Sequence, residues 1–215
     1  MISDSLTKRQ VQLAQLLEIH PTHPQARMIR MVADVIHKGG VIVYPTDTAY
    51  ALACHLGDKT ALDRIIGIRQ LSKHHQFTIA CCDLKSIGAY TRIDNVGYRL
   101  IKRTTPGPFT FVLRATRNVP KRLLHTKHKT IAIRVPDNPI ALALLTQVGE
   151  PLLTTSVRLP GEDKPLPSAY EINERLGKQV EVIIDGGTEY NDVSTVVDLT
   201  QSVPTVIRQG LGELR

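Results

Sequence analysis

The sequence predicts an α/β fold, a single domain in which one twisted sheet of parallel and antiparallel strands is flanked by helices. Short apolar runs typical of buried strands are separated by longer segments whose apolar residues recur at helical spacing. The order is not the strict alternation of an all-parallel sheet, because the last third of the chain has several strand-like runs in succession. No linker rich in glycine and serine and no internal repeat divides the 215 residues, which indicates one domain.

The first 18 residues are expected to form a segment appended to a domain that spans residues 19–215. Between residues 11 and 17, apolar and polar side chains are mixed at a spacing that predicts a short amphipathic helix. A secretory signal would need a continuous apolar stretch and a small-residue cleavage site instead. We therefore expect a cytoplasmic protein whose three cysteines, Cys54, Cys81 and Cys82, are free thiols.

The domain is expected to begin with a helix, since apolar residues recur at helical spacing from residue 26 until Gly39 and Gly40 end the pattern. The next apolar run, residues 41–44, stops at Pro45, as expected for a buried strand. The same two patterns then predict a helix at residues 62–71, a strand at residues 77–82 and two short helices at residues 84–90 and 96–102.

The second half of the domain opens with an apolar run after Pro108, which predicts a strand at residues 109–113. Ser168 and Glu171 have the spacing of a capping box, and this predicts a helix that ends near Leu176. Elsewhere the same patterns predict a helix at residues 140–148 and strands at residues 130–135, 152–155, 180–184, 195–199 and 205–207.

One segment of the chain accounts for its positive charge. The net charge is +7, and the stretch between Asp94 and Asp137 has ten basic residues and no acidic one. A segment of one sign attracts polyanions, which predicts a surface for RNA or a nucleotide. A basic loop that only aids solubility is the alternative. The RNA-binding candidates in this segment are Arg114, Arg117, Lys121, Arg122, Lys127 and Lys129.

Several classes of protein are excluded by what the sequence lacks. A hydrophobic content of 42% excludes a disordered chain, and no apolar run approaches the roughly 18 residues of a membrane span. The phosphate-binding P-loop, the dinucleotide fingerprint after a strand and the nucleophile elbow of serine hydrolases are all missing. Three close histidine pairs have no further ligands beside them, so no metal site is expected.

Polar residues lie at four places where a predicted strand begins or ends. Loops at such places hold a ligand against a rigid sheet, and hydroxyls, backbone amides and nearby arginines suit phosphates and carboxylates. Each segment is also compatible with ordinary turn formation, for which the same residue types are favoured. The four segments are residues 44–50, residues 106–110, residues 154–158, and residues 185–187 together with residues 194–195.

Taken in order, several of these segments resemble the YrdC/YciO family. The segments that carry the resemblance are residues 38–48 (KGGVIVYPTDT), 106–113 (PGPFTFVL), 133–136 (IRVP), 155–156 (TS) and 194–199 (STVVDL). The YciO branch is the most similar, through residues 68–71 (IRQL) and 159–161 (LPG). The resemblance covers roughly residues 20–212 and leaves the N-terminal segment outside it.

This resemblance implies a YrdC-like fold with a deep, positively charged concave face. The family is associated with binding double-stranded RNA. Its synthase members combine threonine, bicarbonate and ATP into threonylcarbamoyl-AMP and pyrophosphate, for the threonylcarbamoyl modification of tRNA. The expected partners are therefore an RNA (double-stranded RNA, tRNA or rRNA), ATP and threonine. No tightly bound cofactor is expected, and ATP would be used with Mg²⁺ if the chain is catalytically active.

Matched by position, the resemblance implies binding roles for eight residues. Thr48 would lie near threonine, and Thr110 near the acyl or phosphate portion. Arg134 and Ser194 would face the nucleotide, and Arg208 would hold phosphate. The full set of expected substrate and nucleotide ligands is Thr48, Arg69, Thr110, Arg134, Ser156, Arg158, Ser194 and Arg208.

The chain departs from the synthase pattern at two motifs. The Lys-x-Arg of the synthases falls on Arg69 and Leu71, and the Asn of their Ser-x-Asn falls on Arg158. Arg69 keeps the charge with a different geometry, whereas Leu71 removes an anion-binding group. We hypothesise that Arg158 supplies the missing charge from the other side of the site. The prediction is a YciO-like protein that binds nucleotide and double-stranded RNA with an altered site. An active threonylcarbamoyl-AMP synthase is the alternative, and an unrelated anion-binding scaffold is the third possibility.

Overall fold

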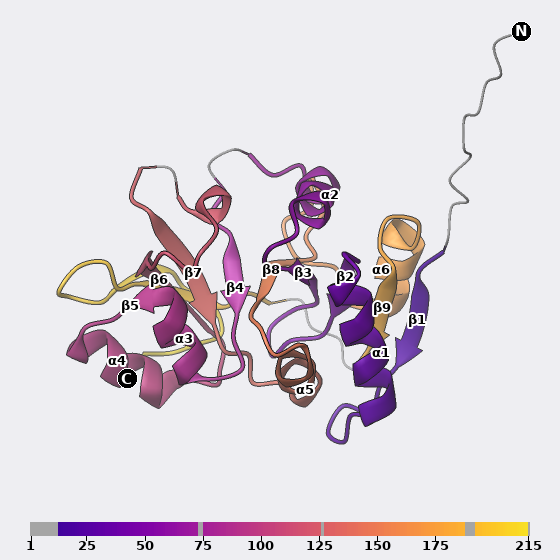
Figure 1. The fold of residues 1–215 in the computed structure, drawn as a ribbon, viewed down its shortest axis with the longest axis horizontal. Coiled ribbons are helices and arrows are strands. Elements are labelled where there is room, and N and C mark those ends of the chain that lie inside the picture. The colour runs from indigo at the N-terminus through magenta and orange to yellow at the C-terminus, as the bar shows by residue number, and fades with distance from the viewer. Residues whose placement is uncertain (1–12, 73–74, 126, 188–191, 215) are drawn as a thin grey trace, which may run out of the picture.

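The computed structural model describes residues 13–72, 75–125, 127–187 and 192–214. These residues form the mixed sheet with flanking helices that the sequence predicts (Figure 1). From one edge to the other, the strands are β1 (Gln15–Glu18), β9 (Val182–Asp185), β2 (Ile42–Tyr44), β3 (Ala51–His55), β8 (Leu152–Ser156), β4 (Thr78–Ala80), β7 (Thr130–Arg134), β6 (Phe109–Ala115), β10 (Thr195–Asp198) and β11 (Thr205–Arg208). The two-residue strand β5 (Thr91–Arg92) pairs with β6 beside this series.

Parallel and antiparallel pairs are mixed along the whole sheet. Strand β9 is parallel to both β1 and β2, β4 is parallel to β7, and β6 is parallel to β10. The pairs β2–β3, β3–β8, β8–β4, β7–β6 and β10–β11 are antiparallel. The helices are α1 (Ala26–His37), α2 (Lys59–Arg69), α3 (Leu84–Tyr90), α4 (Asn95–Thr104), α5 (Pro139–Val148) and α6 (Ala169–Leu176), with a short 3₁₀ helix, η1 (Lys121–Leu123).

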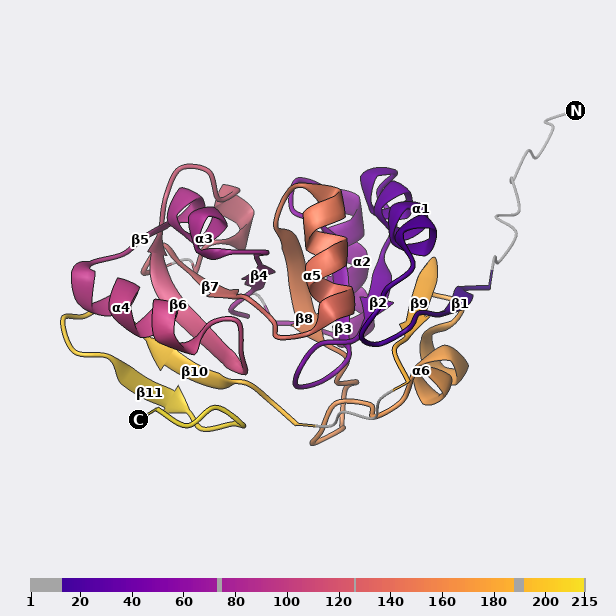
Figure 2. The same cartoon turned by 90° about the horizontal axis from the view of Figure 1, so that it is seen from below.

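Two apolar cores stabilise the sheet. Helices α1 and α5 lie side by side (Figure 2) and bury residues such as Ile36 and Leu144 against β2, β3 and β9. The larger core contains side chains of the other four helices, with Ile65, Ile101 and Phe111 fully buried in it. Among the described residues, no helix is long and apolar enough to cross a membrane. Burial of apolar side chains is the main favourable term in folding, so these two cores fix where the strands lie.

The helix starts follow from local capping. Asp58, Asp83, Asp94, Asn138 and Ser168 each accept a backbone N–H in the first turn of the helix that follows. Each such cap stabilises its helix by roughly 1 kcal/mol. The capping box predicted at Ser168 is confirmed on its N-cap side, since the Ser168 hydroxyl accepts the N–H of Glu171 at 3.2 Å.

The three cysteines are free, as predicted. Cys54 and Cys81 are buried in the larger core, and Cys82 is half-buried. Burial raises the pKa of the Cys54 thiol to about 12 and also raises that of Cys81. A thiolate is therefore disfavoured at both positions, and neither thiol is suited to nucleophilic chemistry.

The structure corrects the prediction for the N-terminal segment. Residues 15–18 are not helical; they form β1, which pairs in parallel with β9 at the edge of the sheet. Leu17 is 6% exposed and packs with Ile19 in the core beneath α1. Tertiary pairing thus overrides the weak helical pattern, because four residues gain a hydrogen-bonded neighbouring strand and Leu17 gains a buried position. Residues 1–12 of the predicted segment lie outside the described residues.

A matched pair of leucines tests the place of β1 in the fold. Replacing buried Leu17 by Ala should lower the free energy of unfolding by about 2–5 kcal/mol, as expected for a core leucine. Leu13, which is 68% exposed in the same segment, should tolerate the same change within about 0.5 kcal/mol. Urea denaturation of both variants measures the difference, and equal effects would contradict the structural role of β1.

Candidate functional site

A cavity of about 320 Å³ lies over the middle of the sheet. Its floor is a row of small side chains on four neighbouring strands. Thr154 of β8 lies opposite Thr78 of β4, which in turn lies opposite Ala132 of β7. Ala132 lies opposite Val112 of β6. Residues that are directly opposite on neighbouring strands place their side chains on the same face. Since none of these four side chains is large, the face of the sheet is hollow at this row.

All eight residues predicted to bind substrate or nucleotide line this one cavity. They come from seven separate parts of the chain, which the sheet brings together. They are Thr48 before β3, Arg69 at the end of α2, Thr110 on β6, Arg134 on β7, Ser156 on β8, Arg158 just after β8, Ser194 just before β10, and Arg208 on β11. Whether each of them binds a ligand stays a prediction.

The loop that carries Thr48 is held by the hydroxyl of its neighbour Thr46. The Thr46 Oγ1 donates to the carbonyl of Ala49 at 2.6 Å and accepts the N–H groups of Thr48 and Ala49 at 3.2 Å each. This is the local hydroxyl-to-backbone bonding that favours threonine in turns. The Thr48 side chain is therefore fixed at the wall of the cavity, where it is 2% exposed.

Arg134 crosses from β7 to this loop. Its Nη2 lies 2.5 Å from Asp47 Oδ1, and its Nη1 donates to the Thr48 hydroxyl at 3.1 Å. The side chains of Arg134 and Asp47 are each only 10% exposed, so the pair is buried. Arg134 Nε and Asp47 Oδ2 have no hydrogen-bond partner among the described residues. The positive charge of Arg134 is thus largely balanced before any ligand arrives.

Arg208 and Ser194 form a second hydrogen-bonded group on the β10–β11 side of the cavity. The guanidinium of Arg208 donates to the Ser194 carbonyl at 2.7 and 3.2 Å and to the Ser194 hydroxyl at 3.2 Å. The Ser194 hydroxyl is in turn 2.8 Å from the hydroxyl of Thr110. Desolvation, with the nearby charges of Arg158 and Arg134, lowers the pKa of Arg208. One O–H is used between the two hydroxyls, so Arg208 and one of the two hydroxyls have donors left for an oxyanion.

Arg69 stands at the C-terminal end of α2, and its burial is unusual for an arginine. The helix ends there because Gln70 adopts the left-handed conformation (φ 47°), while the N–H of Leu71 bonds to the carbonyl of Ile66. Arg69 is 7% exposed, yet its Nε has no hydrogen-bond partner among the described residues. Burial and the charge of Arg158 together lower the pKa of Arg69 to about 10. A buried, unpaired cation is costly unless an anion joins it.

Four polar residues of the cavity were missed by sequence reasoning. His75, Gln76, Thr78 and Asp192 line it, although none belongs to the segments that were singled out. Thr78 is the first residue of β4, near the start of the predicted strand at residues 77–82, so the rule that polar residues at strand ends face ligands could have identified it. Burial lowers the pKa of His75, and the charges of Arg69 and Arg158 add to this effect.

Two sequence observations lie outside the cavity. Residues 185–187 do not line it, and the Asp185 carboxylate instead accepts the N–H of Gly187 at 2.8 Å, which is turn formation. Leu71, the position of the synthase arginine, packs against the larger apolar core. Among the described residues, no group of three or more histidine, cysteine or carboxylate side chains could hold a metal ion.

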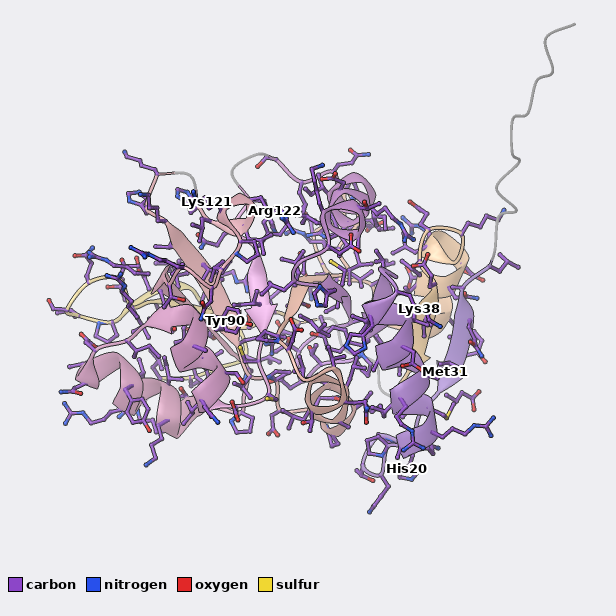
Figure 3. All side chains as sticks on the ribbon, in the orientation of Figure 1. His20, Met31, Lys38, Tyr90, Lys121 and Arg122 are labelled. Carbon is purple, nitrogen blue, oxygen red and sulfur yellow. The ribbon has the colours of Figure 1, made fainter. Side chains whose placement is uncertain are left out.

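The predicted RNA-binding residues lie in three places. Arg114, Lys127 and Lys129 line a second hollow of about 430 Å³, together with Arg92 and His128, and no carboxylate lines it. Lys121 and Arg122 lie on η1 (Figure 3), where the Arg122 guanidinium donates to the carbonyl of Gly57. Arg117 is exposed in the turn between β6 and η1 and lines neither hollow. The structure therefore brings together only half of the six candidates.

Comparisons with known proteins identify the family. A family model for Sua5, YciO and YrdC, described as "Telomere recombination", matches residues 34–210. The chain belongs to this family, as the sequence motifs predict. The YciO protein of Escherichia coli K12 is 49% identical over 203 residues, which cover 94% of this chain and 98% of that protein. The crystal structure of Escherichia coli YciO superposes with a TM-score of 0.91, covering the same shares of the two chains.

The synthases of the family are more distant relatives. A threonylcarbamoyl-AMP synthase of Pyrococcus abyssi is 32% identical over 184 residues, which cover 85% of this chain and 54% of that enzyme. The crystal structure of Pyrococcus abyssi Sua5 complexed with L-threonine superposes with a TM-score of 0.83 at 28% identity, over 91% of this chain and 57% of that one. The chain is thus a YciO-like protein related to threonylcarbamoyl-AMP synthases.

The buried ion pair predicts a measurable dependence of stability on Asp47. Replacing Asp47 by Ala leaves the Arg134 guanidinium buried without its carboxylate, which should lower the free energy of unfolding by about 3 kcal/mol. The exposed pair Lys59–Asp63 provides the control, since Asp63→Ala should change the free energy of unfolding by less than about 1 kcal/mol. Urea denaturation at neutral pH compares the two, and a negligible loss for Asp47→Ala would refute the role given to this pair.

Proposed function

We propose that this chain binds a nucleotide through its phosphate groups in the cavity over the sheet, with ATP as the nucleotide and threonine as the second ligand. The observation that carries the proposal is the wall of the cavity, where Arg69, Arg134, Arg158 and Arg208 converge. Only Arg134 among them forms an ion pair with a carboxylate of the described residues. Three arginines without such a partner in one cavity fit a ligand with several negative charges.

The hydroxyl groups of the cavity suit the same ligand. Thr110, Ser194 and Thr48 are all under 10% exposed and are held by hydrogen bonds to one another or to an arginine. A hydroxyl both donates and accepts, so each can bond to a phosphate oxygen or to the ammonium group of an amino acid. Fixed donors of this kind need little reorganisation when a charged ligand binds. The relation to a structure named as a complex with L-threonine supports the choice of the second ligand.

Synthase activity is the alternative for the same cavity. Thr48, Thr110 and Arg134 line the cavity, whereas the motif positions at Leu71 and Arg158 do not match the synthase pattern. Pyrophosphate release from ATP and Mg²⁺, with threonine and bicarbonate each present or omitted, decides between the two. Release that requires both co-substrates would show a synthase. ATP binding without release would show a nucleotide-binding protein that lacks the chemistry.

Removing Arg208 tests the nucleotide proposal directly. Arg208→Ala should weaken ATP binding roughly 10- to 100-fold, since a charge-assisted hydrogen bond contributes about 1.5–3 kcal/mol. Arg175→Ala removes the same charge from an exposed pair on α6 that does not line the cavity, and it should leave ATP affinity unchanged. Isothermal titration of both variants and the parent chain measures this, with thermal unfolding to confirm that each is folded. No ATP binding by the parent chain would sink the proposal.

A second candidate function is RNA binding, and the hollow around Arg114 favours it. Thr110, Val112 and Arg114 are alternate residues of β6 and so share one face of the strand. The first two line the cavity and the third lines the hollow, so the hollow continues the same sheet face along β6. Arg92, Lys127 and Lys129 add three cations there. We propose that this basic surface contacts the phosphates of a double-stranded RNA.

The salt dependence of RNA affinity tests this second function. If about six phosphates are neutralised, the log–log slope of affinity against salt should be near −5. Replacing Lys127 and Lys129 together by Gln should reduce the steepness by about 2. The control replaces exposed Lys38 and Lys178, which line neither hollow, by Gln and should leave the slope unchanged. Fluorescence anisotropy with a labelled RNA duplex gives the slopes, and equal slopes for both double variants would rule out this surface.

A further inference from the structure

The cavity and the hollow around Arg114 are neighbouring parts of one sheet face. Val112 lines the cavity, and Arg114, the next residue of β6 on that face, lines the hollow. The same holds on β7, where Ala132 lies opposite Val112 and Thr130 lies opposite Arg114. A side-chain hydrogen bond joins the two linings, since the Gln76 amide in the cavity wall donates to the Thr130 hydroxyl at 3.4 Å. The two spaces are therefore continuous along β6 and β7.

The hollow has positive charge that the described residues do not balance. Arg92 of β5 lies directly opposite Arg114 of β6, an arrangement in which like charges repel. Neither arginine forms an ion pair in the described part of the chain. Asp198 of β10 lies opposite Val112, but its carboxylate accepts the N–H of Thr200 at 2.8 Å, and it lines neither space. A bound anion would relieve the repulsion between the two arginines.

The separation of the two spaces corresponds to a few nucleotides. Thr110 in the cavity and Arg114 in the hollow are four residues apart on β6, which is about 13 Å along an extended strand. At roughly 3.4 Å per nucleotide along one strand, this distance spans about four stacked nucleotides. A free nucleotide in the cavity leaves the hollow empty, whereas one RNA molecule can occupy both spaces.

We propose that the cavity receives the terminal nucleotide of a single-stranded RNA end, while the duplex part of the same RNA lies on the hollow. The cavity, at about 320 Å³, has the size of a small-molecule site and is far too small for a base-paired duplex. Single-stranded ends can present an unstacked nucleotide to such a site. The inference rests on the proposed function, because it makes the nucleotide in the cavity and the RNA on the hollow parts of one ligand.

The first experiment compares RNA duplexes that differ in the length of a single-stranded overhang. Fluorescence anisotropy at constant ionic strength should show an affinity that rises as the overhang grows to about four nucleotides and then stays level. Blunt duplexes with the same total number of phosphates are the control for charge. One series has the overhang at the 5′ end and another at the 3′ end, and a gain over the blunt controls in either series supports the inference. No gain in either series overturns it.

The second experiment uses variants that change the cavity alone. Arg208 lines the cavity and not the hollow, so Arg208→Ala should weaken binding of the overhang RNA roughly 10- to 100-fold and leave the blunt duplex unchanged. Unchanged blunt binding also shows that the variant is folded. Thr78→Leu, which adds bulk to the cavity floor, should give the same pattern and serves if Arg208→Ala does not fold.

The matched control for these variants is Arg175→Ala, which removes an exposed arginine outside both spaces. It should leave both RNA affinities unchanged. If a folded cavity variant weakens the overhang RNA and the blunt duplex equally, or weakens neither, the inference is overturned.

Competition with ATP separates this inference from the proposed function. At constant ionic strength, ATP should reduce the affinity for the overhang RNA to the level of the blunt duplex and should not displace the blunt duplex. If ATP binds the chain but leaves the overhang RNA in place, the nucleotide proposal holds and the single-ligand inference is refuted. If the overhang gain is present and is lost in Arg208→Ala while ATP alone does not bind, the inference is supported and the ATP proposal fails.

Discussion

The buried ion pair between Arg134 and Asp47 connects parts of the sheet that are three strands apart. Arg134 ends β7, and Asp47 lies in the loop between β2 and β3, with β8 and β4 between them in the sheet. The guanidinium spans the cavity wall at this point and also bonds to Thr48. A buried pair costs desolvation, and it is stable only when its hydrogen bonds are well formed. The loop and the strand must therefore keep their positions together, which gives the cavity a fixed wall.

The small side chains of the floor have an equal part in making the cavity. Large apolar residues at Thr78, Ala132 or Thr154 would fill the space over the middle strands, as they do in the cores on either side of the sheet. With Ala, Thr and Val there instead, the sheet has a hollow that is lined by hydroxyl groups and closed by arginine side chains. The fold thus lacks apolar packing at this place and has charged side chains around the cavity, a combination that fits the anionic ligand proposed above.

Much of the fold could be predicted because the strongest elements have a strong local pattern. Helix α1 and strands β6 and β7 have the apolar spacing or run that their burial requires. Strand β3 was missed, since its sequence Ala-Leu-Ala-Cys-His has few of the branched and aromatic residues that favour strands. The local pattern predicts a helix at β1 because β9, the strand with which it pairs in the described part of the chain, is far away in the sequence.

The residues expected to bind ligands were predicted from a different kind of signal. The eight expected residues were found through motifs whose order along the chain is specific, and the sheet brings all eight to one cavity. The partners of these residues could not be found in this way. The pairing of Asp47 with Arg134 joins positions 87 residues apart, and His75 and Asp192 reach the cavity from segments without a recognisable pattern. Such contacts depend on the register of the sheet, which the local sequence does not determine.

The departures from the synthase pattern have a common physical meaning in this structure. The position of the synthase arginine holds Leu71, which has become part of the apolar core, so this wall of the cavity has one cation fewer. Arg158 contributes a cation from β8 instead, and its charge acts on Arg69, His75 and Arg208. The chain thus has Arg69 and Arg158, both lining the cavity, at the positions where the synthase pattern has a lysine and an asparagine.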